Sequence, residues 1–149
     1  MRAVVQRVSQ ARVTVANEVV GQISTGLLVY AAAASADTEA DVSYIAEKVA
    51  HLRIFPDADG KMNRSVVDTG GAVLVVSAFT VQADARKGRR PSFDASAAGP
   101  VAAPLIDRLV ASIHSYGLTV ATGQFAAYMS VTSANDGPIC ILLDSRRAF

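Results

Sequence analysis

Apolar and polar residues alternate along the beginning of the chain, as they do in strands with one buried face. The alternation runs through Ala3–Val8 into Ala11–Val15, and it resumes in Val19–Ile23 after a turn at Asn17-Glu18. The next run, Gly26–Ala31, is apolar without alternation, which is typical of a strand buried on both faces. This part of the chain therefore predicts three strands.

Two later segments carry apolar residues at helical spacing. The first helix follows an N-cap at Asp37 or Thr38, and its apolar face consists of Val42, Ile45, Ala46, Val49 and Leu52. The second helix spans Val101–Tyr116 and ends at Gly117. Its apolar face consists of Leu105, Ile106, Leu109, Val110 and Ile113.

The remaining apolar runs are short, and turns separate them. Ala72–Val81 is strongly β-prone, and residues 82–96 are irregular and basic. Turns are expected at Pro56–Gly60 and Asn135–Pro138. The other short strands are expected at Leu52–Phe55, Leu118–Ala121, Tyr128–Ser133 and Ile139–Asp144. Two helices among about seven strands predict one α+β domain over residues 1–149, with a largely antiparallel sheet that curls toward a barrel.

The composition fits one folded domain and restricts the cellular compartments in which we expect it. The 149 residues are 51% hydrophobic and 18% charged, which is far from the signature of disorder. No apolar run approaches the ~18 residues that a membrane span requires. A single Cys excludes an internal disulfide and a cysteine zinc cluster, so we expect a cytoplasmic protein without a membrane segment.

The charge balance excludes a polybasic tail but not a local basic patch. Fourteen Lys and Arg stand against thirteen Asp and Glu, for a net charge of +1. Eleven of these cations are Arg, which suits planar contacts to phosphate or carboxylate. A GC-rich genome would give the same bias without functional meaning, so the charge alone leaves both interpretations open.

Side chains of the usual catalytic kinds are scarce. Asp57-x-Asp59-Gly60 resembles the start of a calcium loop, but it lacks the later acidic ligand and is interpreted as a turn. His51 and His114 lie late in the predicted helices, where the helix dipole alone favours them. Cys140 lies in an apolar strand, where a free Cys is usually a buried small hydrophobe without a base. An enzyme with this sequence would not rely on an obvious side-chain nucleophile.

Two short stretches are unusual for a small domain. Gly137-Pro138 lies at a strand-to-strand turn, where the peptide bond is either an ordinary trans bond or a cis bond. Ser77–Thr80 places small hydroxyls and main-chain amides at the end of the most apolar strand. Such residues commonly form turns, so a functional role needs independent support.

Taken together, the chain resembles the D-aminoacyl-tRNA deacylase family over nearly its whole length. Five segments carry the resemblance in the family's order, namely Met1–Ser9, Leu52–Phe55, Asp59–Asn63, Arg86–Phe93 and Asn135–Pro138. The resemblance implies a homodimeric, metal-free enzyme that needs no cofactor. It would hydrolyse the ester between a D-amino acid, or glycine mischarged on tRNA-Ala, and the 3′ adenosine of tRNA.

The resemblance also implies a mechanism. The Gly137-Pro138 bond would be cis, and its loop would enter the partner subunit's pocket, where the two carbonyls would accept hydrogen bonds from the substrate amino group and exclude an L side chain. Main-chain amides would stabilise the oxyanion, and the 2′-hydroxyl of the terminal ribose would assist the chemistry. The residues implied in catalysis are Ser77, Ala78, Phe79 and Thr80.

Further roles follow from the same resemblance. Phe125 and Met129 match residues of the adenine pocket, and Arg7 matches the arginine that fixes the Gly-Pro loop through its carbonyls. The competing interpretation of Arg7 is an exposed strand residue paired with a surface acid. The substrate-binding set also includes Asn135, Ile139, Cys140 and Ala127. The tRNA backbone would contact Arg86, Lys87, Arg89 and Arg90.

Two departures from the family pattern keep other hypotheses open. Ala78 stands where the family usually has Gln in Ser-Gln-Phe-Thr-Leu, and Cys140 stands where it usually has Thr. A non-catalytic binder of aminoacylated tRNA 3′ ends is therefore the second hypothesis. A hydrolase with Cys140 as nucleophile is the third.

Overall fold

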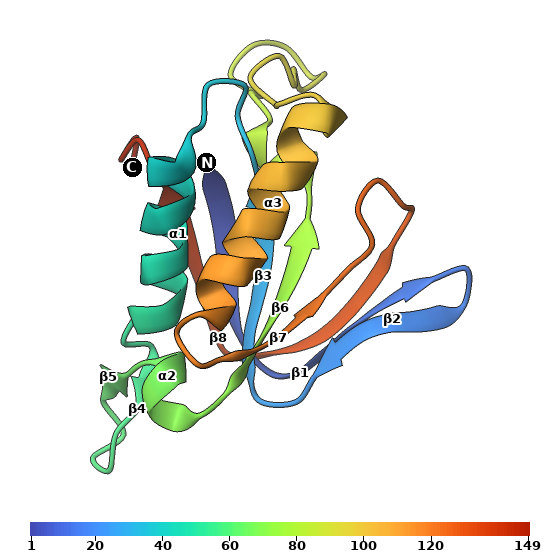
Figure 1. Ribbon diagram of the computed structural model, residues 1–149. Coiled ribbons are helices and arrows are strands. Elements are labelled where there is room, and N and C mark those ends of the chain that lie inside the picture. Colours follow the sequence, from blue (N-terminus) through green and yellow to red (C-terminus); the bar gives the residue numbers. More distant parts are fainter.

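The computed structural model describes residues 1–149 and places two long helices along one side of a strongly curved sheet (Figure 1). The helices are α1 (Glu39–His51) and α3 (Gly99–His114). The six strands of the sheet are β1 (Arg2–Val15), β2 (Glu18–Ile23), β3 (Gly26–Ala32), β6 (Ala72–Ser77), β7 (Thr119–Thr122) and β8 (Ser130–Asp144). The smaller elements are the hairpin of β4 (Phe55–Pro56) and β5 (Met62–Arg64), the short helix α2 (Val66–Thr69) and the 3-10 turn η1 (Phe79–Gln82).

The sheet is mixed, which corrects the prediction of a largely antiparallel one. Strand β1 pairs antiparallel with β2, β3 and β8, whereas β3 pairs parallel with β6, and β6 pairs parallel with β7. The connections explain the difference, because α1 lies between β3 and β6, and α3 lies between β6 and β7. A helical crossover returns the chain to the end of the sheet where the previous strand began, so the next strand runs parallel to it.

Close backbone approach at one glycine brings the sheet near to closing into a barrel. Strand β2 lies against β7, and a Cβ atom at Gly21 would be 2.2 Å from the carbonyl oxygen of Thr122. Only glycine allows two strands to approach in this way. The α+β architecture with a barrel-like sheet and two main helices is therefore confirmed.

Two apolar cores explain why Gly26–Ala31 lacks alternation. Leu27 and Val29 face α1 and α3 and belong to the larger core, whereas Leu28 faces the barrel interior with Leu74 and Val76. Strand β3 is thus covered on both faces, as predicted. The barrel interior is the smaller core, and it opens at the end of β6.

Several predicted boundaries are wrong. Strand β6 ends at Ser77 and the chain turns into η1, so the predicted strand does not extend to Val81. The residues after Ser77 leave the strand in a 3-10 turn and line a cavity at the mouth of the barrel. Helix α3 begins at Gly99, two residues before the prediction, and the expected strand at Leu52–Phe55 is reduced to Phe55–Pro56.

The C-terminal strands form one long element instead of two. Strand β8 pairs with β1 along most of its length, but the register jumps between the pairs Val8–Asn135 and Gln6–Cys140. The chain between these pairs leaves the ladder as a loop that carries Gly137-Pro138. The predicted turn is therefore an excursion within one strand.

Candidate active site

A cavity of about 750 Å³ lies at the mouth of the barrel. It is bounded by the end of β6 with η1, by the first turn of α3, and by the segment before β8. Fifteen of its eighteen lining residues are hydrophobic. The predicted site residues that line it are Ser77, Ala78, Phe79, Thr80, Phe125, Ala127 and Met129.

Aromatic side chains stand exposed around the cavity mouth. Phe79 is 58% exposed and packs edge-on against Phe93, with ring centroids 5.1 Å apart. Phe125 is 40% exposed and Tyr128 is 95% exposed. Exposed aromatic faces beside an apolar cavity suit stacking with a nucleobase.

The main chain at the start of η1 offers free donors. The Ala78 N–H donates to the Ala31 oxygen at 2.9 Å, so it is not available for a ligand. The N–H groups of Phe79 and Thr80 donate to no protein acceptor, because they begin a 3-10 turn and no earlier carbonyl is in place. Two unpaired donors at an apolar cavity can stabilise an oxygen that develops negative charge.

Buried hydrogen bonds hold this turn in place. The Gln82 amide, which is buried, donates from Nε2 to the Ala32 oxygen at 3.0 Å. Ser96 Oγ donates to the Phe79 oxygen at 3.1 Å. The donors of η1 are therefore fixed to β3 and to the segment before α3, and do not depend on ligand binding for their position.

The Gly137-Pro138 loop projects from the sheet away from this cavity. The peptide bond is cis, both residues are exposed, and Gly137 has φ of +125°. Asn135 supports the loop, because its Nδ2 donates to the oxygens of Arg7 and Ile139, each at 2.9 Å. The loop is thus a braced protrusion.

Arg7 braces the same loop through a neighbouring acid. Its side chain is only 11% exposed, its Nη1 donates to the Ile54 oxygen at 2.6 Å, and its Nε lies 2.8 Å from Asp136 Oδ2. It makes no hydrogen bond to the carbonyls of Gly137 or Pro138 within this chain. The interpretation as an exposed arginine is wrong, and the acid that it meets belongs to the loop itself.

The loop and the cavity lie at opposite ends of β3. Arg7, at the base of the loop, pairs with Leu27 near the start of the strand, whereas Ala31 and Ala32 at its end line the cavity. Ala32 lies five residues after Leu27 along the strand, which is a distance of about 17 Å. The predicted site residues therefore fall into two groups that do not meet within one chain.

The basic segment follows η1 along the chain and is exposed. Arg86 forms an ion pair with Asp84 at 2.6 Å, and its hydrogen bonds lower the pKa of the Asp84 carboxyl. Lys87, Arg89 and Arg90 form no ion pair and are exposed. This places three free cations on the chain between two segments that line the cavity.

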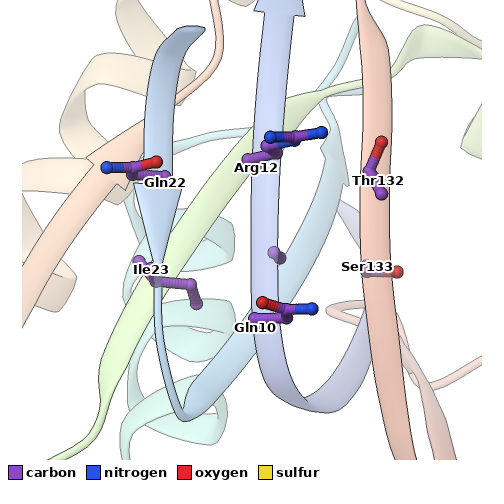
Figure 2. Close-up of a pocket in the computed structure, with 7 residues that line it drawn as sticks. Gln10, Arg12, Gln22, Ile23, Thr132 and Ser133 are labelled. Atoms are coloured by element: carbon purple, nitrogen blue, oxygen red, sulfur yellow. The ribbon is translucent and has the colours of Figure 1, made fainter.

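A second hollow of about 300 Å³ lies on the sheet surface formed by β2, β1 and β8. Figure 2 shows Gln22 on β2, Gln10 and Arg12 on β1, and Thr132 and Ser133 on β8. It contains none of the predicted site residues. This shallow polar surface differs from the apolar cavity at the barrel mouth.

Three other residues considered in the sequence analysis lie outside the cavity lining. Cys140 is exposed, so the expectation of a buried cysteine is wrong, and its Sγ accepts a hydrogen bond from Gln6 Nε2 at 3.8 Å. His51 Nδ1 lies 3.1 Å from the Glu47 oxygen and packs edge-on against Tyr116. Asp57 accepts N–H bonds within its own hairpin, which confirms the turn.

Some lining residues were missed by sequence reasoning. Tyr30 and the alanines that follow it form the floor of the cavity, together with Val76 and Val131. The run Ala31–Ala34 was a usable signal, because small residues at a strand end leave space above the sheet.

No helix of the structure is long and apolar enough to cross a membrane.

The fold and the cavity together define a class: a small α+β barrel protein whose site combines main-chain donors with aromatic side chains. The family model described as D-Tyr-tRNA(Tyr) deacylase matches residues 4–144. A D-aminoacyl-tRNA deacylase of Heliobacterium modesticaldum is 55% identical over 98% of this chain and 97% of its own length. One of Symbiobacterium thermophilum is 54% identical over 100% of this chain and 99% of its own. The chain belongs to the D-aminoacyl-tRNA deacylase family, which makes it an ester hydrolase.

Solved structures share this fold. The "c-Myc DNA Unwinding Element Binding Protein" superposes with a TM-score of 0.91 at 34% identity, over 97% of this chain and 98% of that chain. A "probable eukaryotic D-amino acid tRNA deacylase" gives a TM-score of 0.82 over 95% and 97% of the two chains. Its identity is 19%, so it supports the fold alone.

Proposed function

We propose that this chain removes D-amino acids from tRNA at a site completed by the Gly137-Pro138 loop of a second copy. The observation that carries the proposal is the separation of the two groups of site residues. An apolar cavity with free donors lies at one end of β3, and a braced, exposed loop lies at the other. A two-fold symmetric pair of chains can bring each loop to the other chain's cavity.

The reaction needs water and main-chain donors. Water adds to the ester carbonyl, and the N–H groups of Phe79 and Thr80 stabilise the oxyanion that forms. The bond to the ribose 3′-oxygen then breaks and a proton passes to that oxygen, which yields a free amino acid and tRNA. The ribose 2′-hydroxyl relays protons, so no side-chain base is required. Loss of one such donor costs about 3–4 kcal/mol of transition-state stabilisation.

Chirality is decided by exclusion. The Gly137 and Pro138 carbonyls of the second copy face the α-carbon, accept hydrogen bonds from the amino group, and leave no room for an L side chain. Glycine has no side chain to exclude, so glycyl-tRNA, including tRNA-Ala mischarged with glycine, is also a substrate. Cys140 and Ile139 contribute to the shape of this loop.

The terminal adenosine occupies the aromatic mouth. Its base stacks on Phe125 and contacts the thioether of Met129, and Ala127 leaves room beside them. The cations Lys87, Arg89 and Arg90, with a smaller contribution from the paired Arg86, contact the acceptor-end phosphates. Such contacts are weak and sensitive to salt. A cytoplasmic location, where aminoacyl-tRNA is made, is part of the proposal.

Subunit complementation tests the shared site. A Gly137→Ala chain lacks a working loop, and an Ala127→Trp chain has a filled cavity, so each alone is expected to be inactive. Random mixing after co-refolding gives heterodimers with one intact cavity facing one intact loop, and roughly a quarter of the wild-type rate is expected. No recovery, with heterodimers verified by mass, would contradict a site shared between subunits.

A non-catalytic binder of aminoacylated tRNA ends is the second candidate. Ala78 supports it, because that position lacks the amide side chain usual in the family. The structural relative titled as a DNA unwinding element binding protein supports nucleic-acid binding in this fold. Tight binding of a D-aminoacyl-adenosine analogue without turnover of D-Tyr-tRNA would favour this candidate, whereas turnover excludes it.

A further inference from the structure

Tyr30 is a lining residue of the apolar cavity that carries a hydroxyl group. The residue lies on β3, lines the cavity, and is partly buried. Its side chain packs with Met129 and Val131 against the core of the barrel interior. Its hydroxyl makes no hydrogen bond to any protein group, and burial alone raises the pKa of the phenol. Tyr30 therefore offers a neutral, unpaired O–H donor to whatever occupies the cavity.

The strand register brings Tyr30 beside the catalytic segment. Tyr30 pairs with Val76 in the parallel ladder, and the Ala78 N–H bond to Ala31 continues that ladder by one step. Side chains two residues apart on a strand share a face, so Val76 and Ala78 project on the side of the sheet where Tyr30 lies. Ala78 ends at Cβ and leaves that space to the phenol.

The cavity supplies few other side-chain donors. The hydroxyls of Ser77 and Thr80 lie on the segment that also presents the free amides, and Tyr128 is almost fully exposed at the rim. Phenylalanine would fill the Tyr30 position equally well by packing. A partly buried hydroxyl without a partner is unfavourable unless a ligand or water completes it.

We propose that the Tyr30 hydroxyl donates a hydrogen bond to the substrate's ester carbonyl oxygen, beside the N–H groups of Phe79 and Thr80. Ala78 has no side chain beyond Cβ and leaves the space beside this oxygen to the phenol, so Tyr30 and Ala78 form a matched pair. This inference rests on the proposed function. Tyr30 is then a catalytic residue that acts directly on the reacting group.

Kinetics of three variants test the pair. Tyr30→Phe should lower kcat on D-Tyr-tRNA by about 10- to 100-fold while KM changes by less than about 3-fold, because the bond strengthens as charge develops. Introducing Ala78→Gln into Tyr30→Phe should restore most of the rate, which a packing role could not explain. Tyr44→Phe, on α1 and outside the cavity lining, is the matched control and should keep the wild-type rate. An unchanged kcat in Tyr30→Phe, or a loss that Ala78→Gln does not restore, would overturn the proposal.

A binding measurement tests the Tyr30 contact independently of catalytic activity. The probe is 3′-deoxy-3′-(D-tyrosylamino)adenosine, which keeps the carbonyl but resists hydrolysis. If wild-type protein does not hydrolyse D-Tyr-tRNA, the proposed function fails. The Tyr30 contact still predicts that calorimetry shows about 2- to 3-fold weaker binding of this probe to Tyr30→Phe than to Tyr44→Phe. Equal affinity of the two variants would overturn the contact, and circular dichroism verifies that both remain folded.

Discussion

The Arg7 guanidinium and the Asp136 carboxylate lie 2.8 Å apart at the base of the Gly137-Pro138 loop. Arg7 also donates to the Ile54 oxygen at 2.6 Å, so one side chain ties the loop to the segment before β4. The arginine is largely buried, whereas the Asp136 side chain is 54% exposed. A buried cation thus holds an exposed loop in one position.

Arg7→Lys should disturb this arrangement without removing the charge. A single ammonium cannot reproduce two contacts made by different guanidinium nitrogens. Misplacement of the loop by about 1 Å should lower kcat/KM for D-Tyr-tRNA by roughly 100-fold. Arg12→Lys, an exposed change on the same strand, is the control. Wild-type kinetics in Arg7→Lys would show that the loop does not depend on this contact.

Gly137→Ala should abolish chiral deacylation for steric reasons. The residue has φ of +125°, and an added Cβ would lie 2.7 Å from Ile139 Cγ1. The expected loss in kcat/KM on D-Tyr-tRNA is at least about 100-fold, since the loop must change shape. Gly60→Ala provides the comparison, because Gly60 has φ of +77° with nothing within 4 Å of the added atom. A variant Gly137→Ala that retains the rate of Gly60→Ala would contradict the assigned role of the loop.

Gly21→Ala should destabilise the barrel at its closure. The added Cβ would meet the Thr122 main-chain oxygen at 2.2 Å, and a backbone atom in a sheet cannot move aside cheaply. Overpacking of this kind costs about 1–3 kcal/mol, measured as a lower urea midpoint with an unchanged slope. Val19→Ala on the same strand is exposed and should shift the midpoint little. Equal midpoints for the two variants would show that β2 does not close against β7.

The free energy of unfolding should decrease in acid because Asp41 becomes protonated. Burial opposes its ionisation, but hydrogen bonds from Ser145 Oγ and the Thr38 N–H outweigh burial and lower the pKa of Asp41 to about 2. The folded pKa is below the ordinary value of 3.8, so the stabilisation is complete above that value and is lost as the pH falls toward 2. Ser145→Ala should make urea unfolding less dependent on pH in this window. An identical pH dependence in both proteins would exclude the contribution.

The basic segment should affect binding of tRNA more than chemistry. Replacing Lys87, Arg89 and Arg90 with Ala should raise KM for D-Tyr-tRNA and flatten its dependence on salt, with little change in kcat. Arg86→Ala should have a smaller effect, because Arg86 is already paired with Asp84. Arg108→Ala, on the outer surface of α3, is the control. A salt dependence that stays unchanged in the triple variant would place the acceptor-end contacts elsewhere.

The sequence predicted the elements of this fold better than their arrangement. The apolar periodicity located both long helices, and the unbroken run at Gly26–Ala31 correctly indicated a strand buried on two faces. The direction of strand pairing was not encoded in those local patterns. It follows from α1 and α3 acting as crossovers, which depends on how the helices pack across the whole domain.

The site was predicted unevenly for similar reasons. Motif resemblance identified Phe79, Thr80 and Phe125, which the fold brings to one cavity. Resemblance could not show that the Ala78 N–H donates to the Ala31 oxygen, because that hydrogen bond depends on strand register. Nor could it find Tyr30, whose position in an apolar strand gives no sign of an unpaired hydroxyl.

Parallel deacylation of D-Tyr-tRNA and L-Tyr-tRNA by the purified protein distinguishes chiral deacylation from non-selective hydrolysis and from binding without turnover. The rates should be measured at equal tRNA concentration, with the spontaneous hydrolysis of each substrate subtracted. We predict rapid hydrolysis of the D-substrate and none of the L-substrate above background. Equal hydrolysis of both substrates, or of neither, would contradict the assignment of this site to chiral deacylation.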